Sequence, residues 1–248
     1  MEKENFRKGI YILPNFFTSM NIFCGFYAIL ASIDGQFTNA AIAILVGAVF
    51  DLFDGKIARA TNTTSKFGIE YDSLADLVTS GMAPAIMMIL WVLKPMGRLG
   101  FVAGFLFMIC GALRLARFNT TADSVESSNS FEGLPIPAAA AVCALTILLS
   151  VRLNIDPRPY QMVFLIMLYF LSFCMVSSIK YHSFKKVSFF KKMKFNRLVG
   201  LVLILATVVH EPWIVLFGVF FVYAVSGPII FLYSYHVMLP WQKKKEKE

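Results

Sequence analysis

Four aspartates lie close together in one stretch of this chain, at Asp51, Asp54, Asp72 and Asp76. Carboxylates that converge where water has little access repel one another unless a cation or protons neutralise them. Their hard oxygen atoms suit Mg²⁺, Mn²⁺ or Ca²⁺, and residues 51–76 contain no histidine or cysteine that would favour zinc. The stretch therefore predicts a site for divalent metal ions. Two such ions bridged by carboxylates are an arrangement that promotes phosphoryl displacement.

Helical periodicity gathers these acids on two faces. At about 100° per residue, one face of a helix over residues 38–60 carries Asp51, Asp54, Gly55 and Ala58. Arg59 lies at the edge of this face, where its guanidinium fork suits a phosphate. In the next helix Gly68, Asp72 and Asp76 recur every four residues and form a second stripe. Because the connection is only about seven residues long, the helices are expected to be antiparallel neighbours with all four carboxylates in one cleft.

The composition places these helices in a membrane. The 248 residues are 58% hydrophobic and only 15% charged, with a mean hydropathy of +0.68, whereas soluble domains are about 45–50% apolar and about 25% charged. The net charge of +8 falls in short basic blocks between apolar runs, which indicates membrane topology and no nucleic-acid partner. The four cysteines lie within apolar runs, without metal-binding spacing, and are expected to be buried side chains.

Apolar run length predicts an all-α polytopic protein of about eight membrane spans. The expected spans are 15–33, 38–60, 69–93, 98–118, 135–152, 159–180, 197–210 and 213–237. The excess of lysine and arginine on one side puts both termini and the acidic stretch in the cytoplasm, so a multi-pass protein of the cell membrane is expected. The chain is read as one membrane domain: a catalytic core over about 13–180, then a basic loop, two further spans and a Lys-rich tail over 181–248.

The spacing of the acidic stretch carries a family resemblance. Residues 51–76 match D-x2-D-G-x2-A-R-x8-G-x3-D-x3-D without a gap, and this is the signature of the CDP-alcohol phosphotransferase family. The resemblance implies transfer of a phosphatidyl or related group from a CDP-linked donor to an alcohol, with CMP leaving. It implies that the four aspartates hold two divalent metals, Mg²⁺ or Mn²⁺ with Ca²⁺ as another occupant, and that Asp76 is the general base. Asp51, Gly55, Ala58, Arg59 and Gly68 would line the CDP site, and a homodimer is expected.

Two polar residues of the first span are further candidates for the CDP site. Thr18 and Asn21 lie three residues apart, and they could hydrogen-bond the nucleotide or a metal ligand. The alternative is that they only make polar contacts between helices of the bundle.

Three other segments bear on the acceptor alcohol. Residues 13–26, 114–119 and 131–140 are similar to the corresponding parts of the bacterial phosphatidylserine synthases, a subfamily that transfers the phosphatidyl group from CDP-diacylglycerol to L-serine. Arg114 and Arg117 lie on one helix face at the depth of the acids, and either could bind the serine carboxylate or a lipid phosphate. Their alternative role is positive flanking of a span. Gly133 and Pro135 either shape the start of the fifth span or form a wall of the acceptor pocket.

Several other functions compete with this reading. The same chemistry could use glycerol 3-phosphate or inositol, although a phosphorylated acceptor would need more cations in the cleft. A cation transporter could also use intramembrane acids, but these acids cluster toward one end of their helices, beside Arg59. A set of ion pairs that only stabilises the hairpin does not explain the small residues on the same faces.

Overall fold

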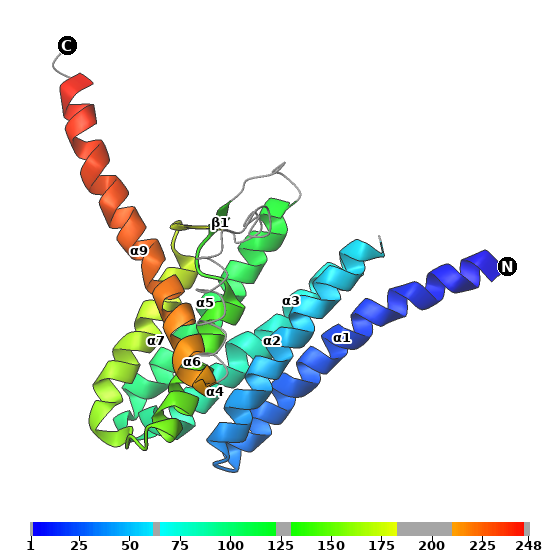
Figure 1. Cartoon of the computed structure of the whole chain (residues 1–248), viewed down its shortest axis with the longest axis horizontal. Helices are drawn as coiled ribbons and strands as arrows, with labels where there is room; N and C mark the ends of the chain where they lie inside the picture. The colour runs from blue at the N-terminus through cyan, green and yellow to red at the C-terminus, as the bar shows by residue number, and fades with distance from the viewer. Residues whose placement is uncertain (1, 62–64, 123–129, 183–209, 246–248) are drawn as a thin grey trace.

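The protein is a bundle of long helices, seen in a computed structural model that describes residues 2–61, 65–122, 130–182 and 210–245 (Figure 1). The principal helices are α1 (Glu2–Ile33), α2 (Phe37–Ala60), α3 (Lys66–Asp76), α4 (Ala83–Met88), α5 (Arg98–Ala122), α6 (Ile136–Arg152), α7 (Gln161–Val176) and α9 (Pro212–Lys245). The expected helical architecture is confirmed. The predicted span at 197–210 lies almost wholly outside the described residues.

One long helical segment is built from several pieces. α3 continues without a break into the π-helix η1 (Leu77–Met82), α4, the π-helix η2 (Ile89–Leu93) and the 3₁₀ turn η3 (Lys94–Met96). Pro84 lies at the start of α4 and has no amide proton for the turn before it, which accounts for the widened helix there. This segment contains the third predicted span, 69–93.

Five helical segments of the described chain are long and apolar enough to cross a membrane. They are Leu13–Ile33, Lys66–Met96, Arg98–Thr120, Arg158–Val176 and Pro212–Phe231. α6 is apolar but shorter, at 17 residues. The membrane character of the chain is thus confirmed, and the number of crossings remains a prediction.

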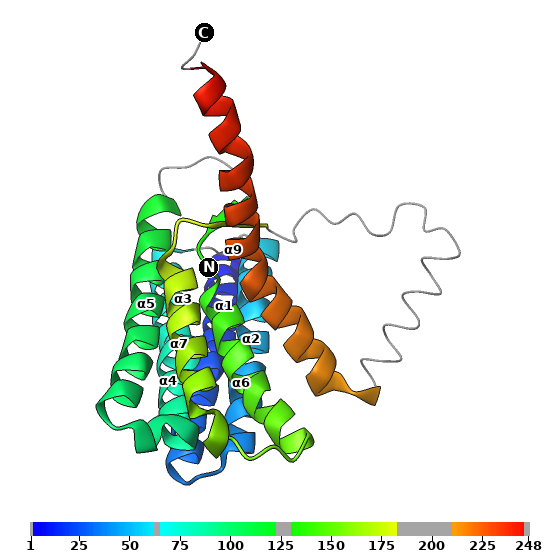
Figure 2. The same ribbon diagram turned by 90° about the vertical axis from the view of Figure 1, so that its left-hand side faces the viewer.

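α6 forms the centre of the bundle. Most of its residues are buried, and it packs against α2, α9 and η1. α1 and α2 lie side by side along their length, and α5 lies beside α7 (Figure 2). At their far ends α1 and α9 extend out of the bundle in different directions (Figure 1).

A short two-stranded sheet lies at one end of the bundle. The sequence predicted only helices, so this sheet was not expected. β1 (Ser130–Glu132) pairs antiparallel with β2 (Lys180–His182), with Phe131 opposite Tyr181. The predicted span at 159–180 therefore ends early, because α7 stops at Val176 and the chain becomes extended at Ser177. Because the two strands are about fifty residues apart in the sequence, no local pattern predicts their pairing.

Candidate active site

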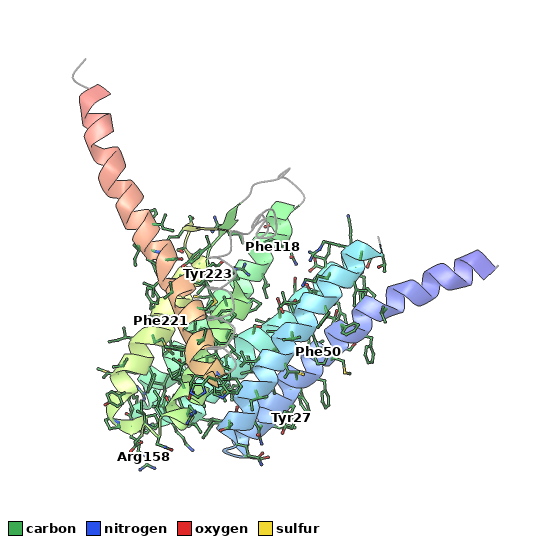
Figure 3. The ribbon with its side chains drawn as sticks, viewed as in Figure 1. Tyr27, Phe50, Phe118, Arg158, Phe221 and Tyr223 are labelled. Atoms are coloured by element: carbon green, nitrogen blue, oxygen red, sulfur yellow. The ribbon has the colours of Figure 1, made fainter. Side chains whose placement is uncertain are left out.

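The acidic site is carried by α2 and α3, which are joined by a short connection. Ser65 caps α3, because its side-chain oxygen accepts a hydrogen bond from the Gly68 amide at 3.0 Å. The C-terminal half of α2, all of α3 and the C-terminal end of α5 lie toward the same end of the bundle. Phe118 lies at this end and Arg158 at the other (Figure 3). α3 runs back from the end that α2 reaches (Figure 1), as the short connection predicts, but α2 and α3 make few direct contacts, because each packs mainly against α1.

Three of the four aspartates converge. Asp51, Asp72 and Asp76 each offer one carboxylate oxygen, and these oxygens all lie within 4.8 Å of one another. Oxygen ligands of one ion at about 2.0–2.6 Å are separated by no more than about 4–5 Å, so this spacing suits a single hard divalent cation. One oxygen of Asp72 is buried without a hydrogen-bond partner, which is unfavourable unless a ligand completes it. The donor set therefore fits a divalent metal ion.

Asp54 belongs to the same site but has a different environment. The Thr18 hydroxyl donates to one of its carboxylate oxygens at 2.9 Å, and the Pro14 carbonyl, 3.1 Å away, is a second acceptor for the same proton. Asp54 is only 4% exposed, yet its charge interacts with those of Asp72 and Asp76. Thr18, a predicted site residue, thus touches a predicted metal ligand.

Asn21 lies against Asp76. Its side-chain amide donates to Asp76 at 3.4 Å, at the long end of the range for a hydrogen bond. Both residues are buried, and the Asn21 side-chain oxygen has no hydrogen-bond partner. The structure therefore brings Asn21, like Thr18, to the acids.

The small residues of α2 leave room beside the acids. The Arg59 guanidinium lies over Gly55, with its nitrogens 3.6 and 3.8 Å from where a β-carbon of Gly55 would be. The charge of Arg59 interacts with those of Asp51 and Asp54. Ala58 is half-buried and Arg59 exposed, which leaves this guanidinium accessible to a phosphate.

Gly68 lies in the first turn of α3, close to α1. A β-carbon there would be 3.2 Å from the Ser65 hydroxyl oxygen and 3.9 Å from a side-chain oxygen of Asn15. The space over this turn is therefore limited, and the absence of a side chain keeps it open.

The two predicted acceptor-site arginines are separated by the structure. Arg114 is half-buried, its charge interacts with that of Asp76, and its Nε is buried without a hydrogen-bond partner. Arg117 is exposed and donates to the Ser178 hydroxyl at 3.5 Å, after the end of α7. Arg114 therefore lies near the acids, and Arg117 contacts the segment after α7.

Gly133 and Pro135 lie where β1 leads into α6. Gly133 has a φ of +78°, a conformation that favours glycine, and its amide donates to the Ile179 carbonyl at 2.9 Å. A β-carbon on Gly133 would overlap the Met175 carbonyl. Pro135 precedes the first turn of α6, so both residues shape this junction. None of their described contacts reaches the aspartates.

Other polar residues near the acids are recognised only from the structure. The Asn119 side chain donates to Ser73 at 3.0 Å and to Glu70 at 3.2 Å, which ties the end of α5 to α3. Thr79 donates to the main-chain carbonyl of Asn21 at 2.8 Å. Asn119 lies in a segment with family resemblance, but its position beside α3 depends on packing between distant parts of the chain.

Comparisons with known proteins agree with this geometry. The profile of the CDP-alcohol phosphatidyltransferase family matches residues 11–176, about two thirds of the chain. A CDP-diacylglycerol–serine O-phosphatidyltransferase of Helicobacter pylori is 38% identical over 216 residues, which cover 87% of this chain and 90% of the relative.

Two further relatives are similar over shorter parts of the chain. An enzyme of Bacillus subtilis with the same name is 36% identical over 176 residues, covering 70% of this chain and 92% of the relative. The archaetidylserine synthase of Methanothermobacter thermautotrophicus is 38% identical over 130 residues, covering 52% and 54% of the two chains. Because the family profile matches two thirds of its length and a relative aligned over most of both chains is 38% identical, this chain belongs to the CDP-alcohol phosphatidyltransferase family.

Proposed function

We propose that this protein transfers the phosphatidyl group of CDP-diacylglycerol to the hydroxyl of L-serine, giving phosphatidylserine and CMP. The observation that carries the acceptor is the 38% identity, over most of both chains, to a relative named for this reaction. The reaction class is supported by the family match and by the carboxylates of Asp51, Asp72 and Asp76.

Two divalent ions, Mg²⁺ or Mn²⁺, with Ca²⁺ as another occupant, are proposed to bind between α2 and α3. Asp51, Asp54, Asp72 and Asp76 would hold them, and the unpartnered oxygen of Asp72 supports a ligand there. When bound, such ions would neutralise the pyrophosphate and stabilise CMP as the leaving group.

Asp76 is proposed to act as the general base. Its carboxylate would take the proton of the serine hydroxyl as the serine oxygen attacks the β-phosphorus of CDP-diacylglycerol. The bond from this phosphorus to the CMP oxygen then breaks, and CMP leaves with the electron pair. The amide of Asn21 against Asp76 would fix the orientation of the base.

The remaining site residues are assigned to the two substrates. Asp51, Gly55, Ala58, Arg59 and Gly68, with Thr18 and Asn21, are proposed to form the CDP site, which the guanidinium over Gly55 supports. Arg114, Arg117, Gly133 and Pro135 are the proposed acceptor or lipid-phosphate residues. Arg114 has the strongest support, since its charge interacts with that of Asp76 and its Nε is unpartnered.

The proposed setting is the cell membrane, with the site facing the cytoplasm. We propose eight spans with both termini cytoplasmic, a single membrane domain with a core over about 13–180, and a homodimer. The lipid tails of the donor must stay in the bilayer, so the site would open sideways between helices, with bilayer lipids as neighbours.

An acceptor assay with purified protein tests this function. Protein in detergent is given CDP-diacylglycerol with Mn²⁺ or Mg²⁺ and then serine, glycerol 3-phosphate or inositol in separate reactions, and CMP release is measured. We expect CMP release with serine and none with chelator or with Asp76→Asn. Release with glycerol 3-phosphate or inositol but not with serine would contradict the acceptor and leave the reaction class standing.

A further inference from the structure

Thr79 makes an unusual contact one turn beyond Asp76. A threonine within a helix commonly bonds to a carbonyl of its own preceding turn, as Thr146 does with Val142 at 2.7 Å. The Thr79 hydroxyl donates instead to the Asn21 carbonyl of α1, at 2.8 Å. Thr79 is completely buried, so this hydrogen bond joins two helices deep in the bundle.

The same contact leads directly to the acids. Asn21, whose main chain accepts from Thr79, donates from its side chain to Asp76 at 3.4 Å. Asp76 and Thr79 lie three residues apart on one continuous helix. The three residues therefore form a closed loop of contacts: Thr79 bonds to the Asn21 main chain, the Asn21 side chain bonds to Asp76, and Asp76 and Thr79 share one helix.

Two glycines allow the helices to come this close. A β-carbon on Gly25 of α1 would lie 2.7 Å from Cα of Thr79. A β-carbon on Gly47 of α2 would lie 2.6 Å from the Thr79 methyl and 2.9 Å from the Asn21 side-chain oxygen. Thr79 thus fills the point where α1, α2 and η1 meet, and both its methyl and its hydroxyl groups have contacts there.

We infer that Thr79 is a positioning residue, which acts through Asn21 to hold the Asp76 carboxylate in its working orientation. This inference rests on the proposed function, in which Asp76 is both metal ligand and base. Loss of the hydroxyl lets α1 shift against η1, so the Asn21 amide leaves Asp76. A displacement of about 1 Å at a reacting group can cost about 100-fold in rate.

Four variants separate the hydroxyl from the packing. Thr79→Val keeps the shape and loses the hydroxyl, whereas Thr79→Ser keeps the hydroxyl. Thr79→Ala and Thr79→Ser form a second pair that differs only by the hydroxyl, for use if the valine variant is not monodisperse in detergent. Thr146→Val is the matched control, because this buried threonine donates to Val142 of its own helix at 2.7 Å and, outside that helix, has only a longer contact of 3.7 Å with the sulfur of Met167.

Steady-state kinetics give the first readout. We expect Thr79→Val to lower kcat by about 10- to 100-fold with little change in KM for either substrate, since orientation is lost and binding is kept. Thr79→Ser and Thr146→Val should stay close to wild type. The inference is overturned if Thr79→Val matches Thr146→Val, or if Thr79→Ser loses as much as Thr79→Val.

Binding of Mn²⁺ alone gives a readout that does not depend on turnover. Titration of the purified protein, followed by the electron paramagnetic resonance signal of free Mn²⁺, should show weaker binding in Thr79→Val and normal binding in Thr79→Ser. Unchanged binding in Thr79→Val would contradict a role in orienting Asp76. A wild-type protein that binds Mn²⁺ but releases no CMP with serine would instead contradict the proposed function.

A double-mutant cycle tests whether Thr79 acts on Asp76 through Asn21. If Thr79 acts through Asn21, then Thr79→Val combined with Asn21→Ala should lose no more kcat than Asn21→Ala alone. Additive losses would show two independent effects and would overturn the proposed route.

Discussion

The acidic site places several negative charges close together. Asp51, Asp72 and Asp76 point one oxygen each into a common space, while Asp54 accepts a hydrogen bond from the Thr18 hydroxyl. The arrangement is electrostatically unfavourable without a cation, because the carboxylates repel one another. The acids that would bind a metal are therefore expected to lower the stability of the metal-free protein, as functional residues often do.

Replacing one of these acids should lower activity and, without metal, raise the stability of the protein. Asp72→Asn keeps the side-chain volume and removes one negative charge, so we expect kcat to fall at least about 100-fold, as on loss of a key electrostatic group. In chelator the melting temperature should rise, because repulsion is relieved, and added Mn²⁺ should raise it less than in wild type.

The control for this prediction is Asp34→Asn, which changes an exposed acid at the turn after α1. It should alter neither kcat nor the response of the melting temperature to Mn²⁺. A fall in melting temperature of Asp72→Asn in chelator would contradict the repulsion argument.

At the scale of elements, close approach between helices and strands positions the site. α9 lies outside the segment matched by the family profile, but it is attached to β2 through Tyr181. The Tyr181 hydroxyl donates to the Ala224 carbonyl at 3.1 Å, and its ring lies where a side chain on Gly227 would be. Burial raises the pKa of Tyr181 above its ordinary value, so the hydroxyl stays a donor at any physiological pH.

Substitution of Gly227 should loosen α9. Gly227→Ala places a methyl group against the Tyr181 ring, so we expect the melting temperature in detergent to fall by several degrees, equivalent to about 1–3 kcal/mol for overpacking. Tyr181→Phe loses only the hydrogen bond and should cost about 1 kcal/mol.

Gly218→Ala is the matched control on the same helix, because nothing lies within 4 Å of its added methyl. Alanine is a better helix former than glycine, so this variant should be neutral or more stable. Equal destabilisation by both alanine variants would show that the Tyr181 contact does not anchor α9.

The whole molecule is a bundle with two distinct ends. Ser178 is exposed beside Arg117, toward the end that carries the acidic site. Asp156 is exposed in the turn between α6 and α7, at the end where Arg158 lies (Figure 3). In the proposed orientation the first end is cytoplasmic and the second is outside.

Labelling of single cysteines tests this orientation. In a variant without the four native cysteines, Ser178→Cys should react with a membrane-impermeant maleimide only in inverted vesicles, and Asp156→Cys only in intact cells or spheroplasts. The physical basis is the excess of lysine and arginine on the cytoplasmic side. Labelling in the reverse pattern would invert the topology, and labelling of both from one side would change the number of crossings between them.

The membrane class, the approximate positions of seven helices and the placement of the acids on one face of α2 and one face of α3 could be predicted from the sequence. These follow from apolar run length and from the periodicity of a helix, which are local properties. The sequence could not show that β1 pairs with β2, that the segment after Asp76 widens into a π-helix, or that Arg117 turns to Ser178 while Arg114 lies near Asp76.

The support of the acids by their neighbours comes from contacts between distant parts of the chain. Thr18 precedes Asp54 by 36 residues, Asn21 precedes Asp76 by 55, and Thr79 contacts Asn21 across 58 positions of sequence. Such contacts depend on how closely two helices approach, which here depends on Gly25 and Gly47. Spacing along one helix determines which side chains share a face, but the distance between faces is determined by packing of the whole bundle.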